Sequence, residues 1–267
     1  KMNDITVIIP VNDVSGEFKN LFTKCIKSLE EQVDKPKKIL VVHAAKNDII
    51  KFFEEWEKPE NLDVDVLFNS GDSSFSGQIN FGVDNIETDW FSVLEFDDEY
   101  SKIWFKNVQQ YIDYYEDVDL FFPLVVETSE TNEFLGFTNE ALWAMGFSEN
   151  MGFLDNNTLL NYQNFQTSGM VMRSESFRDI GGLKSNIKLT FSYEFLLRAT
   201  YNDIQIMTVP KVGYKHTNMR EHSLFWDYKN HPKHKLSPNE AKFWVDTAKK
   251  EYFFTQDRPI KYQTTEA

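Results

Sequence analysis

Residues 89–100 join a hydrophobic run to a dense group of carboxylates. The first half, residues 90–94, carries apolar side chains on both faces, as expected of a strand buried between two layers of helices. The second half holds four acids: Glu95, Asp97, Asp98 and Glu99. In an extended chain, Glu95 and Asp97 point to the same side and Asp98 faces away.

Two interpretations fit a group of acids at the end of a strand. Carboxylates this close repel one another unless a positive group lies among them, and a divalent cation such as Mg²⁺ or Mn²⁺ supplies that charge. The alternative is a solvated acidic turn that closes the strand. The elements that surround the segment bear on the choice.

Strand and helix patterns alternate along most of the chain. Apolar, often β-branched runs predict further strands at residues 4–10, 38–42, 62–68, 120–126 and 204–209. Apolar spacing of one helical face predicts helices at residues 18–29, 47–56, 77–86, 101–115, 174–180, 193–201 and 237–253. Alternation with short connections predicts an α/β fold with a parallel sheet and helices on both faces. In the run at 62–68, valines alternate with acids, which indicates an edge strand.

Length and composition indicate one large domain with an appendage. The chain has 267 residues, 41% hydrophobic and 15% aromatic, which is enough for a sizeable core. Between residues 127 and 167 the periodicity is lost, and a segment this long predicts a lid or an acceptor-side insertion. We expect a main domain at 1–224 and a helical C-terminal extension at 225–267 packed on it.

Charge and apolar runs restrict the partners. The net charge is −14, from 42 acids and 28 bases, so that nucleic acid and anionic membranes are unfavourable partners. The apolar runs are too short to cross a bilayer, and no signal segment is recognisable at the start, so that we expect a soluble, cytoplasmic protein. The single Cys25 excludes an internal disulfide and fits the apolar stripe of a helix as a core thiol.

Several ligand-binding motifs of α/β proteins are absent from the sequence. No Gly-X-Gly-X-X-Gly follows the first strand, no Gly-X-X-X-X-Gly-Lys-Ser/Thr occurs, and no Gly-X-Ser-X-Gly is found. A dinucleotide fingerprint, a P-loop and the usual hydrolase nucleophile are thereby excluded. Since such sheets bind ligands at the carboxyl ends of their strands, the acid group at 95–99 is the remaining candidate.

A series of motifs resembles family 2 glycosyltransferases of the GT-A fold, a Rossmann-like α/β architecture. The similar stretches follow the family's order: residues 8–12, 25–32, Asn80 with Gly82, 90–98, 168–173, 177–183 and 193–198. The resemblance covers roughly residues 4–224. It implies transfer of a sugar from a nucleotide diphosphate sugar, with a UDP-sugar as the expected donor, to a glycan or another hydroxyl-bearing acceptor.

The resemblance also implies roles for individual residues. Transfer requires a diphosphate leaving group, whose charge a bound Mn²⁺ or Mg²⁺ stabilises. Asp97 would be the principal metal ligand, with Glu95 in the first position of the Asp-X-Asp motif and Asp98 nearby. The residues expected on the nucleotide side are Pro10, Val11, Asn12, Asp13, Asp48 and Asn80.

Two family motifs are altered in this sequence. The acidic loop after the second strand reads His43-Ala44-Ala45-Lys46-Asn47-Asp48, in which Asp48 alone is acidic, and His43 is expected to be structural. The Glu-Asp pair of the catalytic base falls on Phe191-Ser192. Glu194 is the nearest acid and the substitute candidate for the base. Alternatively, Glu194 pairs with Arg198 at the favourable i,i+4 spacing.

Histidines follow the last predicted strand. The family places an Arg-X-His or a similar motif here, closing over the phosphates and in some members touching the metal. Arg220-X-His222 fits that spacing, whereas His216 follows the strand more directly. With Lys215 nearby, the loop is expected to face an anion.

The sequence therefore predicts a metal-dependent, inverting glycosyltransferase in which a carboxylate deprotonates the acceptor hydroxyl. The loss of the Glu-Asp pair leaves a second interpretation open, namely a catalytically impaired member of the fold that binds a nucleotide sugar or a glycan. A third is a transferase that acts on modified DNA bases, against which the charge of −14 counts.

Overall fold

The computed structural model describes residues 2–139, 152–161, 163, 165–217, 238–260 and 262. The strands are β1 (Met2–Val11), β2 (Lys35–Ala44), β3 (Val64–Asn69), β4 (Trp90–Val93), β5 (Glu99–Tyr100), β6 (Leu120–Thr128), β7 (Phe134–Thr138), β8 (Phe153–Leu154), β9 (Val171–Arg173) and β10 (Ile206–Thr217). The helices are α1 (Phe18–Glu30), α2 (Asn47–Glu55), α3 (Phe75–Asp84), α4 (Trp104–Tyr114), α6 (Asn156–Asn161), α7 (Ser174–Asp179), α8 (Phe191–Tyr201) and α10 (Pro238–Glu251). This is the expected α/β class.

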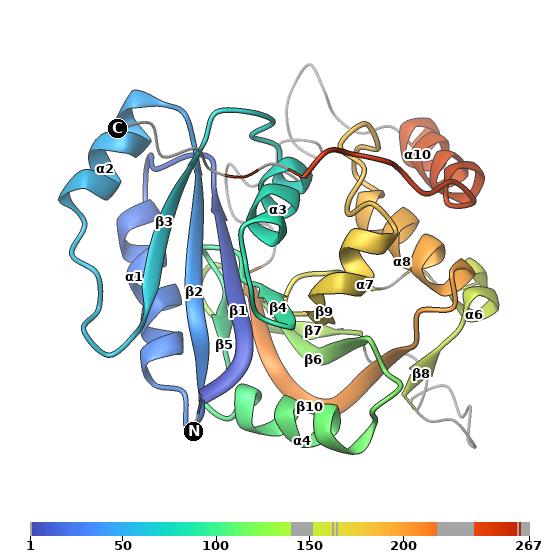
Figure 1. Ribbon diagram of the computed structural model, residues 1–267, viewed down its shortest axis with the longest axis horizontal. Helices are drawn as coiled ribbons and strands as arrows, with labels where there is room; N and C mark the ends of the chain where they lie inside the picture. The colour runs from blue at the N-terminus through green and yellow to red at the C-terminus, as the bar shows by residue number, and fades with distance from the viewer. Residues whose placement is uncertain are drawn as a thin grey trace.

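These strands form one sheet with the main order β3-β2-β1-β4-β9-β6-β10-β5 (Figure 1). β1 pairs in parallel with β2 and β4, and β3 is an edge strand, as the alternating acids of 62–68 predict. β9 runs antiparallel between β4 and β6, so the sheet is mixed rather than parallel throughout. The chain enters β9 at the end of the sheet where β4 finishes, since the Gly169 amide donates to the Val93 carbonyl at 2.7 Å. β9 must therefore run in the direction opposite to β4.

Helices cover both faces of the sheet, so there are two hydrophobic cores, one on each face. Successive side chains of β1 point alternately into one core and the other. Ile5, Val7 and Ile9 pack with the buried faces of α1, α2 and α4. Ile8 faces the other way and packs with α3, α7, α8 and α10. Figure 1 shows α1 and α2 on one side of the sheet and α3, α7 and α8 on the other. Cys25 is buried on α1, and this burial raises the pKa of its thiol, which confirms the prediction of a core thiol.

The last long strand extends further than the sequence predicts. A strand was expected at 204–209, but β10 continues past Pro210 to Thr217. Its pairing with β6 shifts register after Thr208 and again after Val212. Such irregularities let a strand contain a proline, which cannot donate to the ladder. The extension brings the end of β10 to the acid segment, and β5 pairs with it there.

The Asn-X-Gly motif of α3 fixes the position of this helix on its neighbours. Asn80 donates from its amide to the Leu183 carbonyl at 2.8 Å and accepts from the Leu183 amide at 2.8 Å. A Cβ at Gly82 would lie 2.9 Å from a methyl carbon of Ile8, so that glycine lets α3 approach β1 closely. Both residues serve packing, and Asn80 is not among the residues that line the cavity at the carboxyl ends of the strands, so its contact with the nucleotide stays a prediction.

The described parts of 127–167 and of the C-terminal extension pack onto the main sheet layer. β7 pairs with β6, β8 pairs with β10, and α6 lies against α8. α10 also packs on α8, where the Thr190 hydroxyl donates to the Trp244 carbonyl at 2.7 Å. The proposed boundary at residue 224 lies outside the described residues, so the division into domains stays a prediction.

The segment after α10 crosses back to α3 and the turn that follows α7. Gln256 donates to the carbonyls of Gly181 and Leu183 at 2.7 and 2.8 Å. Arg258 donates to both carboxylate oxygens of Asp84 at 2.6 and 3.1 Å, and the Asp84 side chain is fully buried. Because a bidentate pair at a buried carboxylate is among the stronger polar contacts, this segment ties the C-terminal region to the domain.

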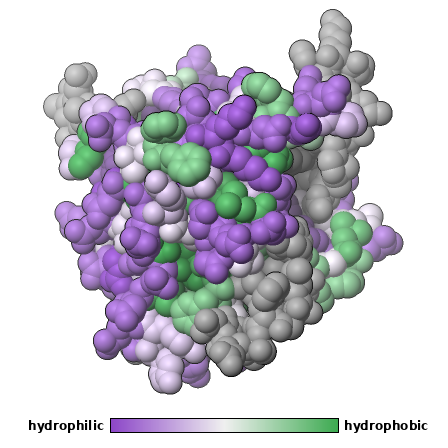
Figure 2. All heavy atoms as spheres, turned by 90° about the vertical axis from the view of Figure 1, so that its right-hand side faces the viewer, coloured by the Kyte–Doolittle hydropathy of each residue, from purple (hydrophilic) through white to green (hydrophobic). Residues whose placement is uncertain are grey.

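One face of the described chain is mainly polar. On the face in Figure 2, hydrophilic side chains predominate and apolar ones form small separate groups. This is an ordinary solvated surface for a chain in which 26% of the residues are charged. Among the described residues, no helix has both the length and the apolar character that a membrane span requires.

Replacing Arg258 with Met tests the tie to α3. We expect a loss of about 3 kcal/mol in the free energy of unfolding, because Asp84 would be left as a buried carboxylate without its bidentate partner. Lys27→Met is the matched control, since the Lys27–Glu31 pair at 3.7 Å is solvent-exposed and should contribute less than about 0.5 kcal/mol. Urea denaturation measures both, and equal stabilities of the two variants would contradict the assignment.

Candidate functional site

A cavity of about 2150 Å³ opens at the carboxyl ends of the strands. It lies where the strand order turns at β1, with β2 and β3 on one side and β4 on the other. Its lining comes from the ends of β1, β6 and β10, the first turns of α3 and α8, one face of α1, and the acid turn. This is the place where an open α/β sheet binds its ligand.

The acids at the end of β4 lie on a tight turn rather than on an extended chain. The Asp98 amide donates to the Glu95 carbonyl at 3.0 Å, and β5 then runs back along β10. The prediction that Asp98 faces away from Glu95 is therefore wrong, because the alternation of a strand ends at Val93. Glu95 and Asp97 both line the cavity. Glu99 pairs with Lys215 at 2.7 Å.

Asp98 is fully buried and is held by three donors from the end of β10. The Tyr214 hydroxyl donates to Oδ2 at 2.6 Å, and the Thr217 amide donates to Oδ1 at 3.0 Å. Nδ1 of His216 lies 3.0 Å from Oδ2. The Tyr214 hydroxyl also accepts from the Glu95 amide at 3.0 Å, so that one side chain holds both ends of the turn.

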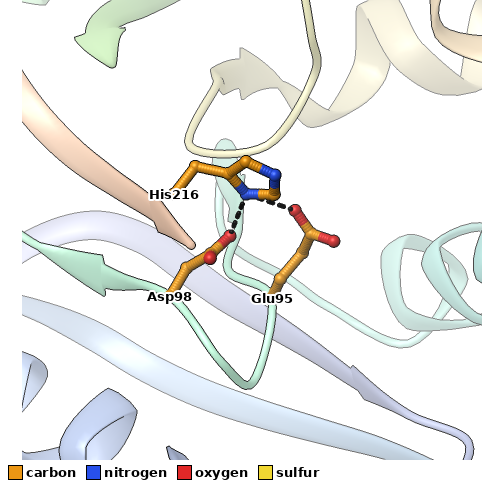
Figure 3. Close-up of side chains that lie close together, drawn as sticks. All are labelled: Glu95, Asp98 and His216. Atoms are coloured by element: carbon orange, nitrogen blue, oxygen red, sulfur yellow. Dashed lines mark hydrogen bonds and ion pairs between the residues drawn. The ribbon is translucent and has the colours of Figure 1, made fainter. Parts of the chain in front are cut away.

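His216 joins two of the acids into a group with metal-ligand spacing. Ligand atoms of Glu95, Asp98 and His216 all lie within 4.8 Å of one another. Figure 3 shows Nδ1 of the imidazole facing both carboxylates, with the other ring nitrogen on the side away from Asp98. Nδ1 lies 3.5 Å from Glu95, whose Oε2 also accepts from the Ser168 hydroxyl at 2.6 Å.

The charges in this group shift one another's pKa values. Burial raises the pKa of Asp98 well above its usual value, and the carboxylates of Asp97 and Glu95 raise it further, against the opposing effect of His216. Burial alone would lower the pKa of His216, but the facing carboxylates, Asp98 foremost, raise it well above its usual value. Acids that disfavour one another's charge in this way are suited to share a bound cation.

The residues expected on the nucleotide side meet different outcomes. Pro10, Asn12 and Asp13 line the cavity. The Val11 carbonyl accepts from the amide of Gln78, which lines the cavity as well. Asp48 is exposed in the first turn of α2 and is not among the residues that line the cavity.

His43, expected to be structural, is a buried residue of β2. Its ring stacks on Phe53 at 5.2 Å, and burial lowers its pKa, so that the neutral form is favoured. The second-strand loop thus brings neither His43 nor Asp48 to the cavity lining.

Glu194 does not face the cavity. Its side chain is fully buried, with Oε1 2.8 Å and Oε2 3.0 Å from nitrogens of Arg198. Lys184 lies 3.2 Å from Oε1. Glu194 is therefore a structural partner of Arg198, which is the alternative interpretation from the sequence. We therefore withdraw Glu194 as the substitute base, because a carboxylate bound to two buried cations has no access to an acceptor.

The position of the family's base pair does border the cavity. Phe191 and Ser192 line it at the start of α8, and the Ser192 and Thr167 hydroxyls lie 3.0 Å apart. Neither side chain is a carboxylate. Arg220 and His222, predicted to close over the phosphates, lie outside the described residues.

Sequence reasoning missed two residues that shape the site, Tyr214 and Ser168. One signal for Tyr214 was available, since Tyr214 and His216 are two positions apart and so share one side of a strand. It depended on recognising that the strand continues beyond Pro210.

Removing the Tyr214 hydroxyl tests its role in the acid turn. Tyr214→Phe should lower the free energy of unfolding by about 1–3 kcal/mol, because Asp98 loses a donor and the Glu95 amide loses its acceptor. Tyr114→Phe on α4 is the control, since that side chain is 79% exposed, and it should change stability by less than about 0.5 kcal/mol. Equal urea midpoints for the two variants would show that the hydroxyl does not hold the turn.

Comparisons with solved structures agree with this fold. The chain is similar to S. aureus TarS 1-349 in complex with UDP, with TM-score 0.58 and 16% identity over 80% of this chain and 60% of that one. It is also similar to TarS 1-349 in complex with UDP-GlcNAc, with TM-score 0.60 and 15% identity over 93% and 71% of the chains. At such identities the likeness establishes a shared fold. The chain thus spans 60% of the first of these structures.

The family comparison covers the part of the chain from β1 to the end of α7, which includes the acid turn, whereas α8 and β10 lie beyond the match. A search of curated proteins found no match. The model described as Glycosyl transferase family 2 matches residues 6–181, about two thirds of the chain. The match runs from β1 through the acid turn to the glycine pair after α7. This chain therefore belongs to glycosyl transferase family 2.

Proposed function

We propose that this protein transfers a sugar from a nucleotide diphosphate sugar to a hydroxyl-bearing acceptor, and that it requires a divalent cation. The observation that carries the proposal is the group of Glu95, Asp98 and His216, set beside the cavity at the strand ends of a family 2 chain. The UDP and UDP-GlcNAc complexes of the similar TarS structures support a UDP-sugar as donor.

The donor set fits Mn²⁺ or Mg²⁺ once the existing hydrogen bonds are considered. Asp98 already accepts from three groups, and Nδ1 of His216 is one of them. We propose that Glu95 and the second ring nitrogen of His216 hold the cation, with Asp98 orienting the imidazole. Asp97, the ligand that the family resemblance implies, lines the cavity but is not in the group within 4.8 Å, and we propose that it completes the site when the cation binds. A carboxylate behind a ligating histidine is a common arrangement in metal sites. When bound, the cation would offset the charge that develops on the leaving diphosphate.

The acceptor side supports the proposal less directly. The family's carboxylate base is replaced by Phe191 and Ser192, and Glu194 is held by Arg198. An inverting displacement, in which the acceptor hydroxyl attacks opposite the nucleotide, follows from the family resemblance. These observations favour, as a second candidate, a chain that binds a nucleotide sugar or a glycan with little or no turnover.

Release of nucleoside diphosphate separates the two candidates. The protein is incubated with Mn²⁺, a panel of nucleotide sugars and hydroxyl-bearing acceptors, and free diphosphate is measured with and without EDTA. If the protein is a metal-dependent transferase, UDP is released from a UDP-sugar, and EDTA abolishes this release. Binding of UDP-sugars without release in any combination would contradict transfer and support the second candidate.

Asp97→Ala tests the cation assignment. We expect UDP binding in the presence of Mn²⁺ to weaken at least tenfold, because the protein loses one of the carboxylates that would hold the cation. Glu54→Gln, an exposed acid on α2, is the control and should leave the affinity unchanged. Isothermal titration provides the measurement. Unchanged affinity in Asp97→Ala would refute the role of Asp97.

Glu194→Gln tests whether Glu194 is structural. We expect the free energy of unfolding to fall by about 3 kcal/mol, because Arg198 and Lys184 would remain as buried cations without a counter-charge. The turnover of the folded protein should remain close to that of the wild type. A large loss of turnover at unchanged stability would restore Glu194 as the base.

A further inference from the structure

Gln78 combines deep burial with a place in the cavity wall. It lies near the start of α3, and its side chain is 1% exposed. It lines the cavity together with Pro10 and Asn12 from the end of β1 and Ser76 from its own helix. A buried amide in a ligand cavity needs partners for both of its polar atoms.

The neighbours of Gln78 fix which end of its amide is which. One end lies 3.1 Å from the Val11 carbonyl, which can only accept, so this end must be the nitrogen. The other end, Oε1, is buried and has no hydrogen-bond partner among the described residues. A buried acceptor left unsatisfied destabilises the folded chain, so a ligand that supplies a donor gains affinity here.

The chemistry of an amide oxygen limits what the ligand can present. Oε1 only accepts, so it does not suit the oxygens of an ionised diphosphate, which also only accept. The remaining donors of a nucleotide sugar near the end of β1 are the imide N–H of uracil and the ribose hydroxyls. In the second-strand loop, neither the buried His43 nor the exposed Asp48 lines the cavity, so Gln78 is well placed to supply an acceptor.

We propose that Oε1 of Gln78 accepts a hydrogen bond from the nucleoside of the donor substrate and thereby contributes to donor selection. The inference rests on the proposed function, because it assumes that the cavity binds a nucleotide sugar. It adds Gln78 to the residues that the sequence expects on the nucleotide side, of which Asp48 and Asn80 do not line the cavity.

A matched pair of variants tests the contact. Gln78→Met keeps the length of the side chain but removes its acceptor. Asn3→Leu is the control, since Asn3 is also 2% exposed, donates to the Phe105 carbonyl at 2.6 Å and has an Oδ1 with no partner in the described chain. Asn3 is not among the residues that line the cavity. Any effect of simply losing a buried amide should therefore appear in both variants.

The readout is the dissociation constant of UDP and of CDP in Mn²⁺, measured by isothermal titration, with stoichiometry reporting the binding-competent fraction. Gln78→Met should bind UDP about tenfold more weakly than the wild type, and Asn3→Leu should bind like the wild type. If the imide N–H is the donor, the wild-type preference for UDP over CDP is lost in Gln78→Met. If a ribose hydroxyl is the donor, UDP and CDP weaken alike.

Two results would overturn the inference. Wild-type affinity for UDP in Gln78→Met would show that Oε1 makes no contact with the nucleoside. An equal weakening in Asn3→Leu would show that the effect is structural. If the wild-type protein bound no UDP at all, the proposed function itself would fail, and that outcome is distinct from either of these.

Discussion

The buried carboxylate of Asp98 is the constraint on which the site depends. A charge without solvent must be met by donors, and here all three come from one short stretch of β10: Tyr214, His216 and Thr217. Satisfying Asp98 therefore fixes the end of β10 against the turn after β4. The same contacts set the ring of His216 and, through the Tyr214 hydroxyl, the backbone of Glu95. Because hydrogen bonds within the protein position Glu95, Asp98 and His216, the proposed cation site would be largely organised before a ligand binds.

Several buried polar residues hold the fold together, and two of them, Asn80 and Glu194, were site candidates from the sequence. Asn80 binds the backbone of Leu183, Glu194 neutralises Arg198 and Lys184, and Asp84 receives Arg258. All of these contacts lie on the α3, α7, α8 and α10 side of the sheet, where the helices need internal polar ties. The cavity wall on this side carries neutral groups such as Gln78, Phe191 and Ser192, together with the cation Lys188. This arrangement favours binding by hydrogen bonds and packing, and it leaves the acceptor side without a carboxylate at the family's position.

Much of the fold was predictable, because buried strands and amphipathic helices leave periodic patterns in a sequence. The edge position of β3, the core thiol of Cys25 and the acid group at a strand end all followed from such patterns. The turn at 95–98 and the extension of β10 past Pro210 did not, since both depend on long-range pairing between segments more than 100 residues apart. For the same reason, the acid that partners His216 became visible only in three dimensions, whereas the pairing of Glu194 with Arg198 is local and was one of the two roles that the sequence offered for Glu194. The unsatisfied Oε1 of Gln78 could not be predicted either, because it is identified only by the hydrogen bond from the amide nitrogen of Gln78 to the Val11 carbonyl.

We propose that the acid turn and His216 hold a divalent cation against the diphosphate of a nucleotide sugar. Anomalous diffraction from crystals soaked with Mn²⁺ and UDP tests it most directly. We expect a manganese peak within coordinating distance of Glu95, Asp97 and the second ring nitrogen of His216, in contact with the diphosphate. Well-ordered UDP in the cavity with no manganese peak at the turn would contradict it.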